Sequence, residues 1–284
     1  MKQMKIGIGT GYIARYGLTE GVRRMRAHGY DCIDYDMANT ETDLYLFSGE
    51  AFEKKAIDVR RAIENAGITV GQTHGPWRFP PKDETEEDRR ERFEKMSLSI
   101  RATGLLGCRH FVIHPIMPFG CWQDPDPDAF MKINRDFFRR LLRVAEENDV
   151  VICLENMPMP ALPVATPETV LRFAQEMNSP FFKVCLDTGH CTVCGCDPAD
   201  AVRLLGKDYL YALHVHDNDG KGDRHWMPYE GVIRWDNFAA SLQDVGFDGT
   251  VSLETYVPSD VPEATWEDTE KQLARAALRL AGRA

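Results

Sequence analysis

The feature that most constrains the fold is a regular alternation of short apolar runs with longer amphipathic segments. The run at residues 4–9 is followed by an amphipathic segment at residues 18–28, and the same order recurs along the chain. No serine- or glycine-rich linker and no change of composition interrupts it. Short apolar runs are typical of buried strands, and apolar residues at every third or fourth position are typical of helices. Strands that alternate with helices in this way predict a parallel sheet.

The expected helices carry residues that are typical of helix ends. Thr166 and Asp197 each precede a proline, which places a capping side chain before the first helical position. Gly67 and Gly246 stand where a left-handed residue ends a helix. We count eight strand–helix pairs in 284 residues, which predicts an α/β fold with one (β/α)8 TIM barrel domain over residues 1–284. A doubly wound open sheet is the alternative.

Six of the apolar runs end in a side chain that can bind a metal ion. In chain order these residues are His74, His114, Glu155, Asp187, His214 and Glu254, with His190 following Asp187 and His216 following His214. The carboxyl ends of all strands in a (β/α)8 barrel lie on one face, so we expect these side chains to meet there. Carboxylates packed together repel one another unless a cation neutralises them. Oxygen and imidazole ligands suit manganese, zinc, iron or magnesium, and the sequence therefore predicts a divalent metal site.

The composition bears on partners and location. A formal charge of −10 argues against a nucleic acid or an acidic membrane surface as a general partner. We find no signal-peptide core and no apolar stretch near the roughly 20 residues of a membrane span. Eight cysteines without a secretory signal favour reduced thiols and a cytoplasmic location. Cys191, Cys194 and Cys196 lie close in sequence, and we favour packing in a short loop over a zinc or redox role.

We expect no organic cofactor. The stretch Gly7-x-Gly9-x-Gly11, which overlaps the end of the first expected strand, is reminiscent of the glycines of a dinucleotide-binding loop. Its spacing does not match that fingerprint, so we discount a dinucleotide.

The order and spacing of seven short motifs resemble those of the xylose isomerase-like barrel superfamily. That superfamily joins sugar and sugar-phosphate isomerases and epimerases to the type-IV apurinic endonucleases. The motifs are His74-Gly-Pro, His114-Pro, Leu154-Glu155-Asn156, Asp187-Thr-Gly-His190, His214-Val-His-Asp217, Asp223-Arg-His225 and Leu253-Glu254. The resemblance covers most of the chain, from the first strand to Glu254, and implies a (β/α)8 barrel of the xylose isomerase type.

The resemblance also implies a ligand set. In the epimerase branch one divalent ion is held by residues that match Glu155, Asp187, His214 and Glu254. His214 is preferred to His216 because the family pattern is a histidine, two residues and then an acid, which His214 and Asp217 satisfy. In the endonuclease branch three metals are bound. The further residues that match this branch are His74, His114, His190, Asp223 and His225.

The charges of the expected loops favour the epimerase branch. A DNA-cleaving face must attract phosphates through lysine and arginine. The loop at residues 36–50 holds four acids and no base, and acids also dominate the loops after the third and fourth strands. Only the loop after the seventh strand, with Lys221, Arg224 and Arg234, leans basic. We therefore expect a small carbohydrate ligand rather than nucleic acid.

These observations predict a metal-dependent isomerase or epimerase of a small sugar, sugar phosphate or related keto compound. Removing a proton beside a carbonyl needs a base, and returning it needs an acid. Glu155 and Glu254 are suited to share these tasks, as the resemblance also implies, with His190 as a further catalytic candidate. Expected substrate contacts are His74, His114, Arg224, Trp77 and Trp122, the last two from an aromatic collar that could stack on a sugar.

Other interpretations stay open. One is a three-metal phosphodiesterase that acts on abasic DNA, and another is a metal-dependent lyase or dehydratase that begins with the same proton abstraction. A third is a non-catalytic sugar-binding barrel, which we disfavour because binding alone does not require two glutamates on a metal. The sequence does not reveal the oligomeric state, and a homo-oligomer is one expectation.

Overall fold

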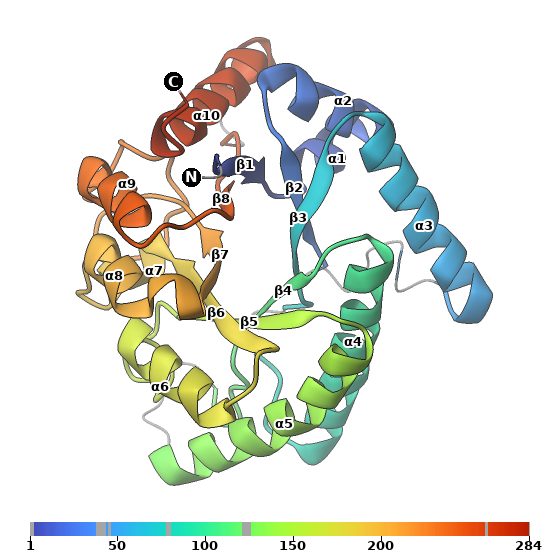
Figure 1. The fold of residues 1–284 in the computed structure, drawn as a ribbon, viewed down its shortest axis with the longest axis vertical. Coiled ribbons are helices and arrows are strands. Elements are labelled where there is room, and N and C mark those ends of the chain that lie inside the picture. The colour runs from blue at the N-terminus through green and yellow to red at the C-terminus, as the bar shows by residue number, and fades with distance from the viewer. Residues whose placement is uncertain are drawn as a thin grey trace.

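The computed structural model describes residues 3–37, 44, 47–77, 81–120, 126–258 and 261–283. Its strands form one parallel sheet surrounded by helices (Figure 1). The strands are β1 (Lys5–Ile8), β2 (Cys32–Asp36), β3 (Thr69–His74), β4 (His110–Ile113), β5 (Val151–Glu155), β6 (Phe182–Asp187), β7 (Leu210–His214) and β8 (Thr250–Leu253). Their order in the sheet is β7-β6-β5-β4-β3-β2-β1-β8. This is the α/β barrel that the sequence predicts.

The barrel closes between β7 and β8 through a single residue. Val215, directly after β7, donates its backbone N–H to Ser252 O at 2.9 Å. Its carbonyl accepts from Glu254 N at 3.1 Å. These bonds join the two ends of the sheet order, so the doubly wound alternative does not apply. They also fix Glu254 beside the end of β7.

The helices cover the outside of the barrel (Figure 1). They are α1 (Gly11–Tyr16), α2 (Leu18–His28), α3 (Gly49–Asn65), α4 (Glu86–Leu105), α5 (Pro127–Glu147), α6 (Pro167–Met177), α7 (Thr188–Val193), α8 (Pro198–Tyr209), α9 (Trp235–Asp244) and α10 (Trp266–Leu280), with a 3-10 turn η2 (Glu263–Thr265). The six-residue helices α1 and α7 were not predicted, because so short a segment shows no apolar period. Among the described residues, every helix is too short or too polar to cross a membrane.

The predicted helix ends are confirmed. Thr166 accepts a hydrogen bond from Thr169 N, and Asp197 accepts one from Ala199 N at 2.8 Å, so both side chains cap their helices. Gly67 has φ of 79°, in the left-handed region where glycine ends a helix without strain. These local signals set the helix lengths, and the helix lengths in turn set where each strand begins.

The interior of the barrel is packed with small and apolar side chains. A cluster inside the strands contains Val112, Val151, Cys153, Cys185 and Ala212. The two cysteines are therefore core residues, as their apolar surroundings in the sequence predict. The larger core lies between the strands and the helices. Among the described residues, buried histidines and carboxylates gather near the carboxyl ends of the strands, where the candidate site lies.

Candidate active site

The six predicted strand-end residues converge on one face of the barrel. Each lies at the last residue of its strand or at the residue directly after it. They are His74, His114, Glu155, Asp187, His214 and Glu254. All but Glu254 are buried, and a cavity of about 430 Å³ opens beside them. The geometry that the barrel rule predicts for these residues is therefore present.

Four of these side chains form a group that could hold one metal ion. Ligand atoms of Glu155, Asp187, His214 and Glu254 all lie within 4.8 Å of one another. His214 Nδ1 is 2.9 Å from Glu155 Oε1 and 3.3 Å from Glu254 Oε2. Ligands at about 2.0–2.4 Å from a common ion lie at such separations. Glu254 Oε2 is buried and, within the part of the chain that the structure describes, accepts no hydrogen bond, so the donor set fits a divalent cation.

The side chain of Asn156, directly after β5, holds the backbone of Asp187 in place. Asn156 Nδ2 donates to Asp187 O at 3.1 Å, and Asp187 N donates to Asn156 Oδ1 at 2.8 Å. The carboxylate of Asp187 also caps α7, accepting from His190 N at 2.6 Å. One aspartate thus faces the site and starts the helix that carries His190.

Asp34, which the sequence analysis did not single out, orients His214. It lies in β2, where the register against β3 shifts between Ile33 and Asp34. Asp34 Oδ2 is 3.1 Å from His214 Nε2 and accepts from Gln72 Nε2 at 2.8 Å. With a metal ion bound, Nε2 would keep its proton for Asp34, and Nδ1 would give up its own and offer its lone pair to the metal. The available signal was an acidic residue within an apolar strand, which is rare in a core.

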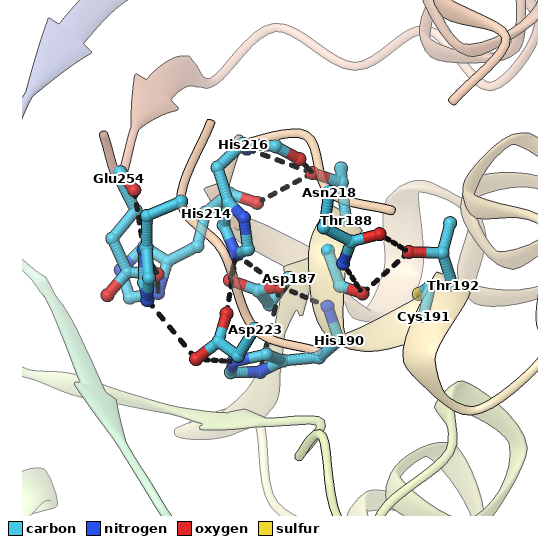
Figure 2. Close-up of polar contacts among 12 residues, drawn as sticks. Asp187, Thr188, His190, Cys191, Thr192, His214, His216, Asn218, Asp223 and Glu254 are labelled. Carbon is cyan, nitrogen blue, oxygen red and sulfur yellow. Dashed lines mark hydrogen bonds and ion pairs between the residues drawn. The ribbon is translucent and has the colours of Figure 1, made fainter. Parts of the chain in front are cut away.

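A second cluster adjoins the first through Asp187. Figure 2 shows Asp187, His190, His216 and Asp223 with their side chains turned toward one another. His216 Nε2 lies 3.1 Å from Asp187 and 3.5 Å from Asp223, and His190 Nε2 lies 3.4 Å from Asp223. His225 Nε2 is 3.1 Å from Asp223 Oδ2. Two metal-capable groups can be formed here, one with Asp187, His190 and His216 and one with His216, Asp223 and His225.

His74 and His114 approach the opposite oxygen of the shared glutamate. Their Nε2 atoms lie 3.3 Å and 3.1 Å from Glu155 Oε2. The same two nitrogens are 3.2 Å apart. The indole of Trp77 stands edge-on to His114, with ring centroids 4.4 Å apart, and lines the cavity. A fourth metal-capable group combines His74, Glu155 and His214.

The comparisons with known proteins identify the family. The model for the xylose isomerase-like TIM barrel matches residues 22–280. The chain belongs to that family. Its sequence is 24% identical to D-psicose 3-epimerase from Enterocloster bolteae over 266 residues, covering 90% of this chain and 83% of the relative. It is 22% identical to L-ribulose-5-phosphate 3-epimerase from Salmonella paratyphi C over 240 residues, covering 84% and 81%.

The fold of this xylose isomerase-like barrel also has solved counterparts. The crystal structure of the IOLI protein with a zinc atom superimposes with a TM-score of 0.79. The identity is 19%, and the match covers 99% of each chain. At that identity the likeness shows the fold. The sequence-based assignment to this family and fold is thus confirmed.

Mutual contacts shift the pKa values of the site in opposite directions. Burial alone lowers the pKa of a histidine, but Glu155 raises that of His74 to about 9 and Asp187 raises that of His190 to about 10. Burial raises the pKa of Glu254 to about 7, with His214 opposing the shift and Glu155 adding to it. Glu254 is thus the acid of the group that most needs a further positive charge.

The remaining predicted residues have different surroundings. Arg224 is 49% exposed and pairs with Asp219 of its own loop at 3.2 Å, and it is absent from the described lining of the cavity. Its role in substrate binding stays a prediction. Trp122 lies outside the described residues. The described metal-capable groups contain no cysteine, and Cys191 is buried in α7, where burial raises the pKa of its thiol.

The cavity also has walls that the sequence analysis missed. Tyr256, after β8, stacks on His225 with ring centroids 5.5 Å apart and is 56% exposed. Glu270 of α10 lines the cavity from the far side. The spacing of Glu270 within an amphipathic helix gave no signal, because an acid there resembles any solvated helix residue.

Proposed function

We propose that this protein is a divalent-metal-dependent epimerase or isomerase of a small carbohydrate. The observation that carries the proposal is the approach of Glu155 and Glu254 to the same nitrogen of His214, with Asp187 completing the group. Two sequence relatives that match most of the chain are 3-epimerases, of D-psicose and of L-ribulose 5-phosphate. The metal ion, when bound, would polarise the substrate carbonyl and lower the energy of the negative charge that develops on its oxygen.

The two glutamates would move the proton. In a 3-epimerisation the C–H bond beside the carbonyl breaks, its electron pair forms an enediolate, and a proton returns to the opposite face of the same carbon. One carboxylate accepts the proton while the other carboxylic acid delivers one. Glu155 projects from β5 and Glu254 follows β8, so they approach a substrate from different parts of the barrel.

The histidines would position the substrate. His190 Nδ1 lies 2.7 Å from Asn156 O, so this nitrogen donates to the carbonyl. Its Nε2 then faces Asp223 and the cavity, where it can contact a substrate hydroxyl. His114 Nδ1 is buried without a partner in the described structure and is available to a ligand. Trp77 supplies the apolar surface on which a sugar face can stack.

The test is turnover of D-psicose and L-ribulose 5-phosphate in deuterated water with manganese supplied. We expect conversion of at least one ketose and deuterium at the epimerised carbon, because the returning proton comes from an exchanging carboxyl group. The same protein treated with a chelator is the control. The absence of both conversion and deuterium exchange with these two ketoses would refute the proposal. Elimination products in place of an epimer would assign the lyase alternative, which shares the first step.

A second candidate function rests on the three adjoining metal-capable groups. His74 with Glu155, and His216 with Asp223 and His225, extend the ligand set beyond one ion. This inventory is what a three-metal phosphodiesterase needs, as the resemblance to the type-IV endonucleases implies. We expect no incision of duplex DNA that contains an abasic site, with zinc or manganese supplied. Cleavage at roughly 1 per second or faster would favour the phosphodiesterase instead.

A further inference from the structure

The cavity has a second polar end, away from the metal-capable groups. This end lies between α1 and α10, which come from opposite ends of the chain and are adjacent at the rim of the barrel. Its lining residues are Tyr12, Arg15, Val257, Glu270 and Leu273. One continuous cavity of about 430 Å³ therefore reaches from Glu254 to Glu270. We call the part around Arg15 and Glu270 the distal subsite.

Glu270 is a buried carboxylate with one satisfied oxygen and one that is not. The residue is 1% exposed. Its Oε1 accepts from Tyr16 OH at 2.9 Å and from Arg15 Nη1 at 3.5 Å. Its Oε2 accepts no hydrogen bond within the described structure, and the nearest cationic candidate, His28 Nδ1, is 3.8 Å away. An unsatisfied buried acceptor costs about 1–3 kcal/mol, so a ligand that donates to Oε2 would offset a real penalty.

Arg15 supplies donors beside this acceptor. Both of its hydrogen bonds are long, 3.5 Å to Glu270 Oε1 and 3.5 Å to Val257 O. Its guanidinium lies over the ring of Trp266, 4.3 Å from the centroid, which holds the group beside Glu270. A guanidinium has five N–H donors, so several remain for a ligand. The distal subsite thus offers an acceptor and donors side by side.

We propose that the distal subsite binds the hydroxyl groups at the unphosphorylated end of a polyhydroxy substrate and discriminates against a phosphorylated one. A sugar hydroxyl both donates and accepts, so neighbouring hydroxyls can donate to Glu270 Oε2 and accept from Arg15. A phosphate group at neutral pH carries nearly two negative charges and has no proton to donate to Glu270 Oε2. Arg15 could pair with a phosphate, but Glu270 Oε2 would stay unsatisfied and would repel it. In this enclosed place the repulsion from Glu270 is weakly screened. This inference rests on the proposed function and names its substrate class.

A purely structural role would be to tie α1 to α10. Asp31 gives a matched control, because it pairs with Arg283 just beyond the end of α10 and accepts from Ile6 N at 2.9 Å. That pair joins the same two ends of the chain at the opposite face of the barrel. If Glu270 only tied these ends together, Asp31→Asn should lower the stability of the protein in the same way, and it leaves the residues that line the cavity unchanged.

The experiment measures binding of D-psicose and L-ribulose 5-phosphate by calorimetry, on manganese-loaded wild type, Glu270→Gln and Asp31→Asn. Thermal unfolding of each variant is recorded in parallel. We expect the wild type to bind D-psicose more tightly than the phosphate. Glu270→Gln should weaken the affinity for D-psicose about 10-fold or more, which is the effect of losing a hydrogen bond to a charged group. It should also improve the affinity for L-ribulose 5-phosphate relative to that for D-psicose. Asp31→Asn should change neither affinity.

Each other outcome is decisive. Unchanged D-psicose affinity in Glu270→Gln, tighter binding of the phosphate by the wild type, or no saturable binding of D-psicose overturns the distal subsite. Should Glu270→Gln fail to fold, Glu270→Asp is the second variant, because it keeps the charge on a shorter side chain that no longer reaches the ligand. The affinity for D-psicose must then fall, and L-ribulose 5-phosphate must still bind more weakly than D-psicose. Wild type that binds D-psicose with the expected selectivity yet converts no ketose would defeat the proposed function and leave the subsite standing.

Discussion

Strand β4 carries a histidine at each end, and the two have different surroundings. His114, after the carboxyl end, lies 3.1 Å from Glu155 and lines the cavity. His110, at the amino end, packs edge-on against Tyr211 with ring centroids 5.7 Å apart. Burial lowers the pKa of both histidines, that of His114 to about 4. Burial alone therefore does not mark a functional histidine, whereas its position on the carboxyl face does.

The charged residues of the two faces differ in the same way. At the amino face, Arg109 and Asp149 form an ion pair with both side chains at least 60% exposed. Such pairs contribute about 0.2–1 kcal/mol and tolerate substitution. At the carboxyl face, Glu155 and Asp187 are fully buried among histidines. Removing one partner there leaves an unpaired buried charge, so we expect much larger effects.

The largest expected effect is on catalysis. Glu155→Gln and Glu254→Gln should each reduce turnover at least about 10²-fold at saturating metal, because the amide cannot accept the proton. Steady-state rates with an accepted ketose measure this loss. Asp149→Asn at the amino face is the matched control, and its rate should equal that of the wild type. Recovery of both glutamine variants on adding metal would show that these glutamates serve only as ligands.

The next effect is on stability. Metal bound at the carboxyl face should raise the free energy of unfolding by about 2.7 kcal/mol at a concentration 100 times its Kd. Chelation should therefore lower the melting temperature of the wild type and of Asp149→Asn alike. Asp187→Asn should lose most of this response, because Asp187 belongs to the four-residue group. An equal response in the Asp187 variant would remove it from the ligand set.

A smaller effect, on metal affinity, is expected for Asp34, which contacts the candidate ligand His214. In the wild type, Asp34 Oδ2 lies 3.1 Å from His214 Nε2. Asp34→Asn keeps the size of the side chain but weakens this interaction. We expect metal affinity to fall about 10- to 100-fold, the usual effect of removing a partner that orients a metal-binding histidine. Metal titration of the apo protein measures it. Unaltered affinity would mean that Gln72 and the strand alone hold His214 in place.

The smallest effect concerns His110 at the amino face. Burial, with Arg109, lowers its pKa below the ordinary 6.5. Below pH 6.5 the unfolded chain binds this proton before the folded chain does, so the stability contributed by His110 is complete above that pH and falls as the pH decreases. His110→Gln should flatten the decline in unfolding free energy between neutral and mildly acidic pH. A decline equal to that of the wild type would assign the acid sensitivity to other groups.

Local patterns in the chain predicted the strands, the helix ends and the face on which the candidate site residues meet. Apolar runs and caps such as Thr166 and Gly67 are local, so their period and chemistry predict strands and helix ends without knowledge of the rest. Placing Glu155 and Asp187 on one face followed from parallel strands alone, because their carboxyl ends must share a face. Motif order then identified the family.

Which atoms come into contact depends on how the barrel closes. The division of His214 and His216 between two adjoining clusters depends on barrel closure at Val215, which no local pattern encodes. Asp34 reaches His214 across 180 positions, and Glu270 reaches Tyr16 across 254. Arg224 pairs with Asp219, because this acid is only five residues away in the same loop. Such pairings arise from register and closure, which bring together residues whose separation in the chain carries no signal.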